Sequence, residues 1–340
     1  MLEQLGLLVV PLVAWDNLFS DLPGHTVDGL TRGAIYALVA LGYTLVYGVM
    51  RLINFAHSEV FMVGTWAVLG IYTVIGAAEG DALWFVIVAT LVALIGAMLA
   101  SAGTALAVER IAYRPLRKKN APPLIFLITA IGCSLVLLEI FGQVLHAFFG
   151  EPFGRKTISI PSLVQTEQLI GPRGSLLTTD AVTITNLQLI IFLGAVGMML
   201  ALDMFVNRSR LGRGVRAVAQ DPDTAALMGV NQDRVFMLVF ILGGAMAGVA
   251  ALLYTMQFDI TKFNIGFLIG IKAFTAAVLG GIGNLRGALL GGLLLGIVEV
   301  YSSTLFDSSW ADVTAFILLI LVLMIRPTGI LGESLGKARA

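Results

Sequence analysis

Side chains that could do chemistry are scarce in this 340-residue sequence, and many of them lie in one polar passage, residues 207–234. The passage predicts a short helix, because Asp221 can cap it, Pro222 suits its first position and Asp223 favours its positive N-terminus. Gly229 can take the left-handed conformation that ends such a helix. The chemistry that this arrangement offers is the recognition of another surface.

The predicted helix has an apolar body that includes Leu227 and Met228, and a helix of about two turns cannot bury that face in a core of its own. Two interpretations remain open. The face docks into a groove of a soluble partner on the cytoplasmic side, or it rests on lipid headgroups as an interfacial connector. The candidate coupling residues are Asp221, Pro222, Asp223, Thr224, Ala225, Leu227, Met228, Gly229, Arg213 and Arg216.

Two further polar groups interrupt long apolar segments, one between Gly48 and Gly64 and one between Gly280 and Gly292. Polar, broken backbone at membrane depth is tolerated where it is buried in protein or lines a water-filled path, and transporters build gates from such helices. Each group could equally be an ordinary cytoplasmic turn with capping residues. The candidate path and gate residues are Asn54, His57, Ser58, Glu59, Lys272, Asn284 and Glu299.

Several ionisable groups fall within or near apolar segments, where each would cost roughly 2.5–3.5 kcal/mol at a helix centre. We therefore expect each to face protein or water. Lys272 and Glu299 lie on neighbouring segments and could pair, whereas Glu109 and Asp203 lie near the inner boundary and could snorkel. With Glu139 added, the groups are scattered along the chain, which weakens the hypothesis of a proton- or sodium-driven carrier.

Several function classes find no support in the residues. Three histidines and one cysteine, far apart in sequence, predict no metal site. The nearest sequence to a phosphate-binding loop, residues 332–337, has three residues between its glycines instead of four, so ATP hydrolysis would have to come from another chain. A net charge of zero makes nucleic acid an unexpected partner, and no cofactor is expected.

The elements that must position these residues are membrane helices. The sequence is 58% hydrophobic and 12% charged, with a mean hydropathy of +0.94, which predicts an all-α polytopic membrane protein. Recurrent pairs of glycines four residues apart favour close helix packing. We expect spans at about 27–50, 57–77, 83–109, 122–148, 186–206, 235–257, 264–282, 287–306 and 311–326.

Cations predict the orientation of these spans. With residues 207–234 inside, 15 of the 21 lysines and arginines lie on the cytoplasmic side, the N-terminus lies outside and the C-terminus inside. Residues 149–185 then form an outer cap, which could receive a partner or act as a lid. Residues 1–26 are an apolar or interfacial segment with no expected cleaved signal, 27–332 form the membrane domain, and 333–340 form a cytoplasmic tail.

Five collinear motifs resemble one family. They are GYTLVYGVMRLINFAHSEVFMVG from Gly42, ERIAYRPLR from Glu109, GRGVRAVAQDPDTAALMGVN from Gly212, KAFTAAVLGGIGN from Lys272 and RPTGILG from Arg326. Together they span about residues 27–332 and resemble the LivH-like permeases of ABC importers for branched-chain amino acids. The resemblance implies a type II-like importer permease in the inner membrane, paired with a second permease, two cytoplasmic ATP-binding subunits and a periplasmic substrate-binding protein.

The resemblance also implies roles for residues. Residues 221–229 would be the coupling helix that sits in an ATPase groove, and Asn54, His57 and Glu59 fall on the family's Asn-Phe-Ala-His-x-Glu turn. The sequence departs from the family in having Ser58 where glycine is usual, and residues 284–286 where many relatives have a smaller or proline-containing turn. Related importers also carry urea, amides or other amino acids. A stand-alone ion-coupled carrier and a membrane-embedded enzyme remain as alternatives from other classes.

Overall fold

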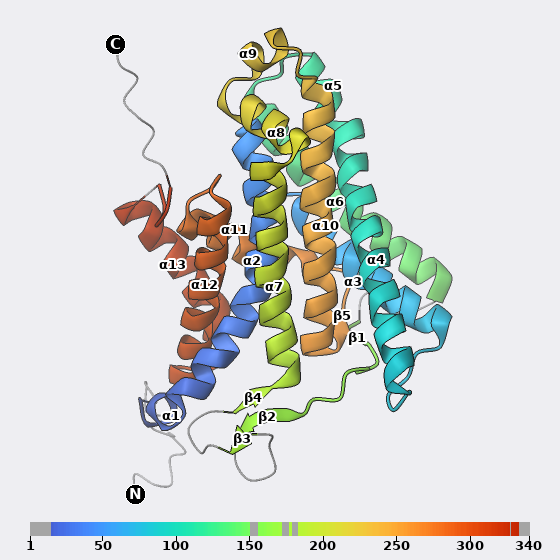
Figure 1. Ribbon diagram of the computed structural model, residues 1–340, viewed down its shortest axis with the longest axis vertical. Coiled ribbons are helices and arrows are strands. Elements are labelled where there is room, and N and C mark those ends of the chain that lie inside the picture. Colours follow the sequence, from blue (N-terminus) through green and yellow to red (C-terminus); the bar gives the residue numbers. More distant parts are fainter. Residues whose placement is uncertain (1–14, 150–155, 172–176, 179–182, 327, 333–340) are drawn as a thin grey trace, which may run out of the picture.

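The computed structural model describes residues 15–149, 156–171, 177–178, 183–326 and 328–332, and it is helical over most of that length. The long helices run roughly along one axis (Figure 1). The helices are α1 (Trp15–Ser20), α2 (Leu22–Met50), α3 (His57–Ile75), α4 (Leu83–Val108), the π-helical turn η2 (Glu109–Tyr113), α5 (Arg114–Lys118), α6 (Pro123–Phe149), α7 (Asn186–Arg208), α8 (Arg210–Gln220), α9 (Pro222–Leu227), α10 (Gln232–Phe258), α11 (Ile265–Gly280), α12 (Leu285–Leu305) and α13 (Trp310–Ile325).

Among the described residues, 7 helices are long and apolar enough to cross a membrane, and α11 and α13 are shorter apolar helices. These elements correspond in order to the predicted spans, so the prediction of an all-α polytopic membrane protein is confirmed. The two 16-residue helices rise about 24 Å each, somewhat less than the hydrocarbon thickness.

Helix α2 is the centre of the bundle. It packs against α12, α10, α11 and α7. Of the 18 residues in its most apolar stretch, 83% are buried. The crossing with α12 is close because glycines face each other: a Cβ added to Gly33 would lie 2.6 Å from the carbonyl oxygen of Gly292, and one added to Gly296 would lie 2.2 Å from that of Gly29. The predicted role of these glycines in helix packing is confirmed.

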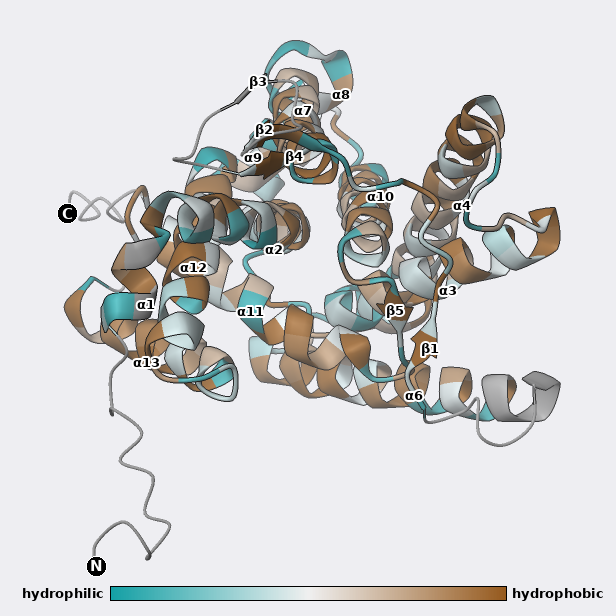
Figure 2. Cartoon of the chain, turned by 90° about the horizontal axis from the view of Figure 1, so that it is seen from below, coloured by the Kyte–Doolittle hydropathy of each residue, from teal (hydrophilic) through white to brown (hydrophobic). Residues whose placement is uncertain are grey.

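The outer helices turn apolar side chains outward. In the most apolar 18-residue stretch of α6, only 11% of the residues are buried. The corresponding value for the helical segment that contains α4 is 22%. Seen along the bundle, brown apolar residues cover the free faces of α4, α6 and α13 (Figure 2). Such surfaces are suited to lipid or to a second membrane chain.

Short strands and the predicted docking segment occupy opposite ends of the long axis (Figure 1). The strands are β1 (Ile158–Ser159), β2 (Gln168–Gly171), β3 (Leu177–Thr178), β4 (Ile184–Thr185) and β5 (Ile260–Thr261). Strand β2 lies between β3, which is parallel to it, and β4, which is antiparallel, whereas β1 pairs with β5 antiparallel. The described part of the predicted outer cap is therefore tied to the end of α10. Residues 150–155, 172–176 and 179–182 of the cap, 1–14 of the N-terminal segment and 333–340 of the tail lie outside the described residues.

Candidate coupling and translocation sites

Helix α9 forms at one end of the molecule, and its cap is the predicted one. The Asp221 carboxylate accepts hydrogen bonds from the backbone N–H groups of Asp223 at 3.0 Å and Thr224 at 3.1 Å. A further hydrogen bond from the Thr224 hydroxyl lowers the pKa of the Asp221 carboxyl, which keeps the cap anionic. Gly229 closes the segment at φ +84°. The helix is therefore held by its own residues.

The apolar residues at the end of α9 face away from the protein. Leu227 is 87% exposed and Met228 is 80% exposed, whereas Ala225 is buried against the rest of the chain. Two large apolar side chains on a rigid, capped turn form a surface that another molecule can bury. Among the candidate coupling residues, Arg213 is exposed and Arg216 donates from its guanidinium to the carbonyl of Val206, which ties α8 to α7.

A partly buried ionic network links the start of α10 to the segment that follows α4. The Arg117 guanidinium lies 3.0 Å from the Glu109 carboxylate and 2.7 Å from that of Asp233, and Arg114 lies 3.0 Å from Asp233. The expectation that Glu109 snorkels to the inner boundary was wrong, because the side chain is fully buried and paired. The Gln232 amide donates to the carbonyl of Pro222 at 2.6 Å. Helices α9 and α10 are therefore in direct contact.

The turn after α2 returns into the bundle instead of staying at its end. His57, the first residue of α3, packs on Gly42, where an added Cβ would lie 2.2 Å from its Nε2, and its ring meets Tyr43 edge-on at 4.8 Å. Gly42 lies eight residues before the end of α2, so α3 begins about 12 Å inside that end. The break in the helical pattern is thus buried in protein, one of the two conditions under which such a break is tolerated.

The side chains of this turn are buried and incompletely paired. Asn54 accepts from the Tyr113 hydroxyl at 3.1 Å. One Glu59 oxygen accepts from Ser134 of α6 at 3.1 Å and lies 3.4 Å from the Ser58 hydroxyl. Three buried atoms of the turn have no hydrogen-bond partner within the described part of the chain: Asn54 Nδ2, His57 Nε2 and Glu59 Oε2. Buried polar atoms are rarely left unpaired, so this turn is a candidate for binding or gating.

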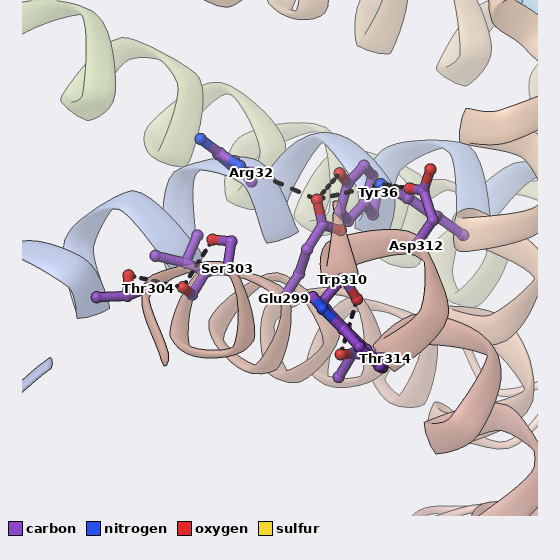
Figure 3. Close-up of polar contacts among 10 residues, drawn as sticks. Arg32, Tyr36, Glu299, Ser303, Thr304, Trp310, Asp312 and Thr314 are labelled. Carbon is purple, nitrogen blue, oxygen red and sulfur yellow. Dashed lines mark hydrogen bonds and ion pairs between the residues drawn. The ribbon is translucent and has the colours of Figure 1, made fainter. Parts of the chain in front are cut away.

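A second polar cluster joins four helices (Figure 3). The Glu299 carboxylate of α12 accepts from Lys272 Nζ of α11 at 3.1 Å and from the Tyr36 hydroxyl of α2 at 3.1 Å, with Arg32 Nη1 at 4.0 Å. Lys272 also lies 2.7 Å from Asp312 of α13. The predicted pairing of Lys272 with Glu299 is confirmed. Two positive and two negative charges balance in this cluster, which pins α13 to the centre of the bundle.

The third candidate, Asn284, caps a tight turn between α11 and α12. Its Oδ1 accepts from the backbone N–H groups of Arg286 at 3.1 Å and Gly287 at 3.2 Å, and its Nδ2 donates to the carbonyl of Leu331 at 2.9 Å. Gly281 and Gly283 have φ values of +102°, which glycine alone adopts easily. This geometry favours the interpretation of a capped connecting turn.

The predicted path and gate residues therefore lie at three heights along α2 and do not form one constellation. The Lys272 ammonium lies over the Tyr36 ring, His57 packs on Gly42, and Gly48 faces the turn at Gly283. Successive positions 36, 42 and 48 are about 9 Å apart on a helix. The charged cluster lies nearest the strand end and Asn284 nearest the α9 end.

Sequence reasoning missed several members of these sites. Arg32 was inside a predicted span, which was a usable signal because a cation there needs a partner. Asp312 was at the start of the predicted span 311–326, and Arg117 was between two predicted spans. The other two ionisable groups also have partners. Asp203 of α7 lies 3.5 Å from Arg286 of α12, and the exposed Glu139 accepts from Gln143 of its own helix at 2.7 Å.

Comparison with known proteins decides what these elements belong to. The profile of the family described as "Branched-chain amino acid transport system / permease component" matches residues 25–323. The chain belongs to this family. The permease LivH of Salmonella typhimurium is 41% identical over 90% of this chain and 94% of its own length, and BraD of Pseudomonas aeruginosa is 42% identical with the same coverage. Both are named as permease proteins of high-affinity branched-chain amino acid transport systems.

Among solved structures, PsaBC from Streptococcus pneumoniae in complex with Fab matches with a TM-score of 0.43 and 13% identity, over 88% of this chain and 91% of that chain. The family places the chain among multi-pass ABC transport permeases and not among enzymes. Permeases of this kind generally work with ATPase and substrate-binding partners. The recognition made from the five sequence motifs is confirmed.

Proposed function

We propose that this chain is the membrane-spanning subunit of an importer that carries branched-chain amino acids into the cytoplasm, driven by ATP hydrolysis on partner subunits. The observation that supports the ATP-driven mechanism most strongly is the geometry of α9. This capped helix presents Leu227 and Met228 at the end of the molecule opposite the strands. A helix of this kind fits a groove on a soluble subunit.

Force from such a partner would reach the bundle through α10. The Gln232–Pro222 hydrogen bond joins α9 to α10, and the Arg117 network joins α10 to η2 and α5. Transport then depends on contacts that differ between an inward-facing and an outward-facing arrangement. The coupling residues Asp221 and Gly229 act by holding α9 in shape, and Arg216 acts by fixing α8 to α7.

The α2–α3 turn is the proposed gate. Asn54, His57, Ser58 and Glu59 are all buried in this structure, so a path along them requires neighbouring helices to separate. Glu59 lies where three helices meet, because one oxygen accepts from Ser134 of α6 and the other lies against Gly266 of α11. Opening α6 from α3 would expose its carboxylate to the path.

A second permease is the proposed partner of the outer helices. Glu139 is exposed on α6, whose large exposed side chains are mostly apolar, and a carboxylate facing lipid is costly. A second chain or a water-filled path between two chains would remove that cost. An external substrate-binding protein would then meet the strand end, in the orientation with the N-terminus outside and the C-terminus inside.

The substrate class is proposed from the relatives, whose names refer to branched-chain amino acids. Urea, amides or other amino acids remain the alternative within this class of importer. A stand-alone ion-coupled carrier is the alternative from another class. It would transport in liposomes without any ATPase subunit when an ion gradient is applied, whereas the proposed importer would not.

Reconstitution of the permease complex in liposomes tests the role of α9. Leu227→Asp and Met228→Asp should abolish ATP-dependent uptake, because they place charge on the docking face. The matched controls Leu227→Met and Met228→Leu keep that face apolar and should retain uptake. Uptake that stays at the control level in both Asp variants would refute the docking role, while the membrane fold, checked by gel filtration, should be the same in all four.

A further inference from the structure

A groove of about 780 Å³ lies beside the α9 segment, between α8, the end of α4 and the first turns of α10. It is separate from the α2–α3 turn and from the charged cluster around Glu299. Four arginines line it, one from η2, two from α8 and one from α10: Arg110, Arg210, Arg213 and Arg234. In Figure 1, α8 lies beside the upper turns of α10.

These arginines carry positive charge without protein counterions. All four are exposed, and none forms a salt bridge within the described part of the chain. Among the described residues, the one hydrogen-bonding contact of their side chains is from Arg110 Nη2 to the sulfur of Met237 at 3.9 Å. The neighbouring acid, Asp233, is already paired with Arg114 and Arg117. The groove thus presents an unneutralised positive field.

The floor of the groove is apolar and extends into the membrane-spanning length of two helices. Leu106 lies one turn before Arg110 on the helix that leads to η2, and Ile241 lies two turns after Arg234 on α10. The two helices run in opposite directions, so both side chains lie on the same side of the arginines. Seven residues of α10 place Ile241 about 10 Å beyond Arg234.

We propose that this groove binds one anionic phospholipid. The arginines hold the headgroup phosphate, as basic pockets between membrane helices do, and an acyl chain lies along Leu106 and Ile241. Positive charge at the helix boundary followed by an apolar floor matches the order of groups in a lipid. An acidic surface of a soluble partner could pair with the arginines but would leave the apolar floor uncovered. Such a partner does not reach 10 Å into the membrane-spanning region. The bound lipid would brace α8, which leads directly into α9.

Native mass spectrometry of the full-length chain, purified in detergent and stripped of lipid, tests the proposal with phosphatidylglycerol and phosphatidylcholine as probes. Phosphatidylglycerol should bind with clear preference. Each arginine should contribute about fivefold to affinity, so Arg110→Gln with Arg234→Gln should weaken binding about 25-fold. The matched control, Arg51→Gln with Arg208→Gln, removes two exposed arginines outside the groove and should leave the affinity unchanged.

Two further measurements separate the sources of the effect. Leu106→Trp fills the floor and should weaken phosphatidylglycerol binding without weakening binding of glycerol phosphate. Raising the salt concentration should weaken phosphatidylglycerol binding of the unmodified chain, because exposed charges are screened. Equal binding of the two lipids, or equal loss in the control variant, would overturn the proposal. So would Arg110 and Arg234 substitutions that keep lipid binding but prevent retention of the ATPase subunits, since the groove would then serve a protein partner.

Discussion

Removing the Lys272 ammonium should destabilise the protein more than removing the Glu299 carboxylate with which it pairs. The two side chains are 12% and 4% exposed. In Lys272→Met, Glu299 retains only the Tyr36 hydroxyl and Arg32 at 4.0 Å, so we expect a loss near the about 3–5 kcal/mol found when a buried pair is broken. In Glu299→Leu, Lys272 still has Asp312 at 2.7 Å, and the loss should be about 1–3 kcal/mol.

A double-mutant cycle measures the interaction itself. Denaturant unfolding of the purified chain in mixed micelles should show that Lys272→Met with Glu299→Leu costs less than the sum of the single variants, with a coupling of at least about 1 kcal/mol. Asp312→Asn is the matched control at the half-exposed edge and should cost about 0.2–1 kcal/mol. Single effects that add within about 0.5 kcal/mol would refute the assignment of a buried, mutually dependent pair.

Three other predictions concern packing, the gate and the cap. Gly292→Ala would place a Cβ 2.5 Å from the Ala37 backbone and should lower the free energy of unfolding by about 1–3 kcal/mol. In the control Gly132→Ala on α6, the added Cβ meets nothing within 4 Å, so this variant should unfold at the same temperature as the unmodified protein. Glu59→Gln should reduce uptake while ATP hydrolysis continues, and a full uptake rate would argue against the gate. The pKa of the Asp221 carboxyl is lowered in the folded protein, so the stability that this cap gives α9 is present above the unfolded pKa and is lost as pH falls through the folded pKa. A spin label attached at position 228 should therefore become mobile in acid. The Asp221→Asn variant should show no such pH dependence.

Much of the fold follows from local properties of the sequence. The spans are predictable because about 20 apolar residues are needed to cross a bilayer, and the caps at Asp221 and Asn231 are predictable because side chain and helix start are neighbours in sequence. The helical state of residues 210–220 was missed. The three-residue spacing of its buried positions Gly212, Val215 and Val218 was a usable helical signal among the arginines that surround them.

The sites were harder to predict from the sequence, because they depend on which helices become neighbours. The depth of His57 follows from a chain reversal onto Gly42, and nothing in the turn itself specifies that contact. The same applies to Glu109, whose partner Arg117 is eight residues away but across a π-helical turn. Lys272 and Glu299 were paired correctly because neighbouring antiparallel helices constrain each other. Of their further partners, Asp312 lies on α13, which follows α12 in the chain, whereas Tyr36 and Arg32 lie on α2, far from both residues in sequence.

Cross-linking from α9 tests the central claim, that this helix docks on an ATPase subunit. In a chain carrying Cys133→Ser, the substitution Met228→Cys leaves one thiol on the exposed end of α9, and Val74→Cys places the control thiol on an 88% exposed position of α3. With a photoreactive maleimide in the assembled complex, the account predicts that Met228→Cys cross-links to the ATPase subunit, to an extent that changes with nucleotide, and that Val74→Cys does not. An assembled, ATP-hydrolysing complex in which residue 228 gives no such cross-link would contradict it.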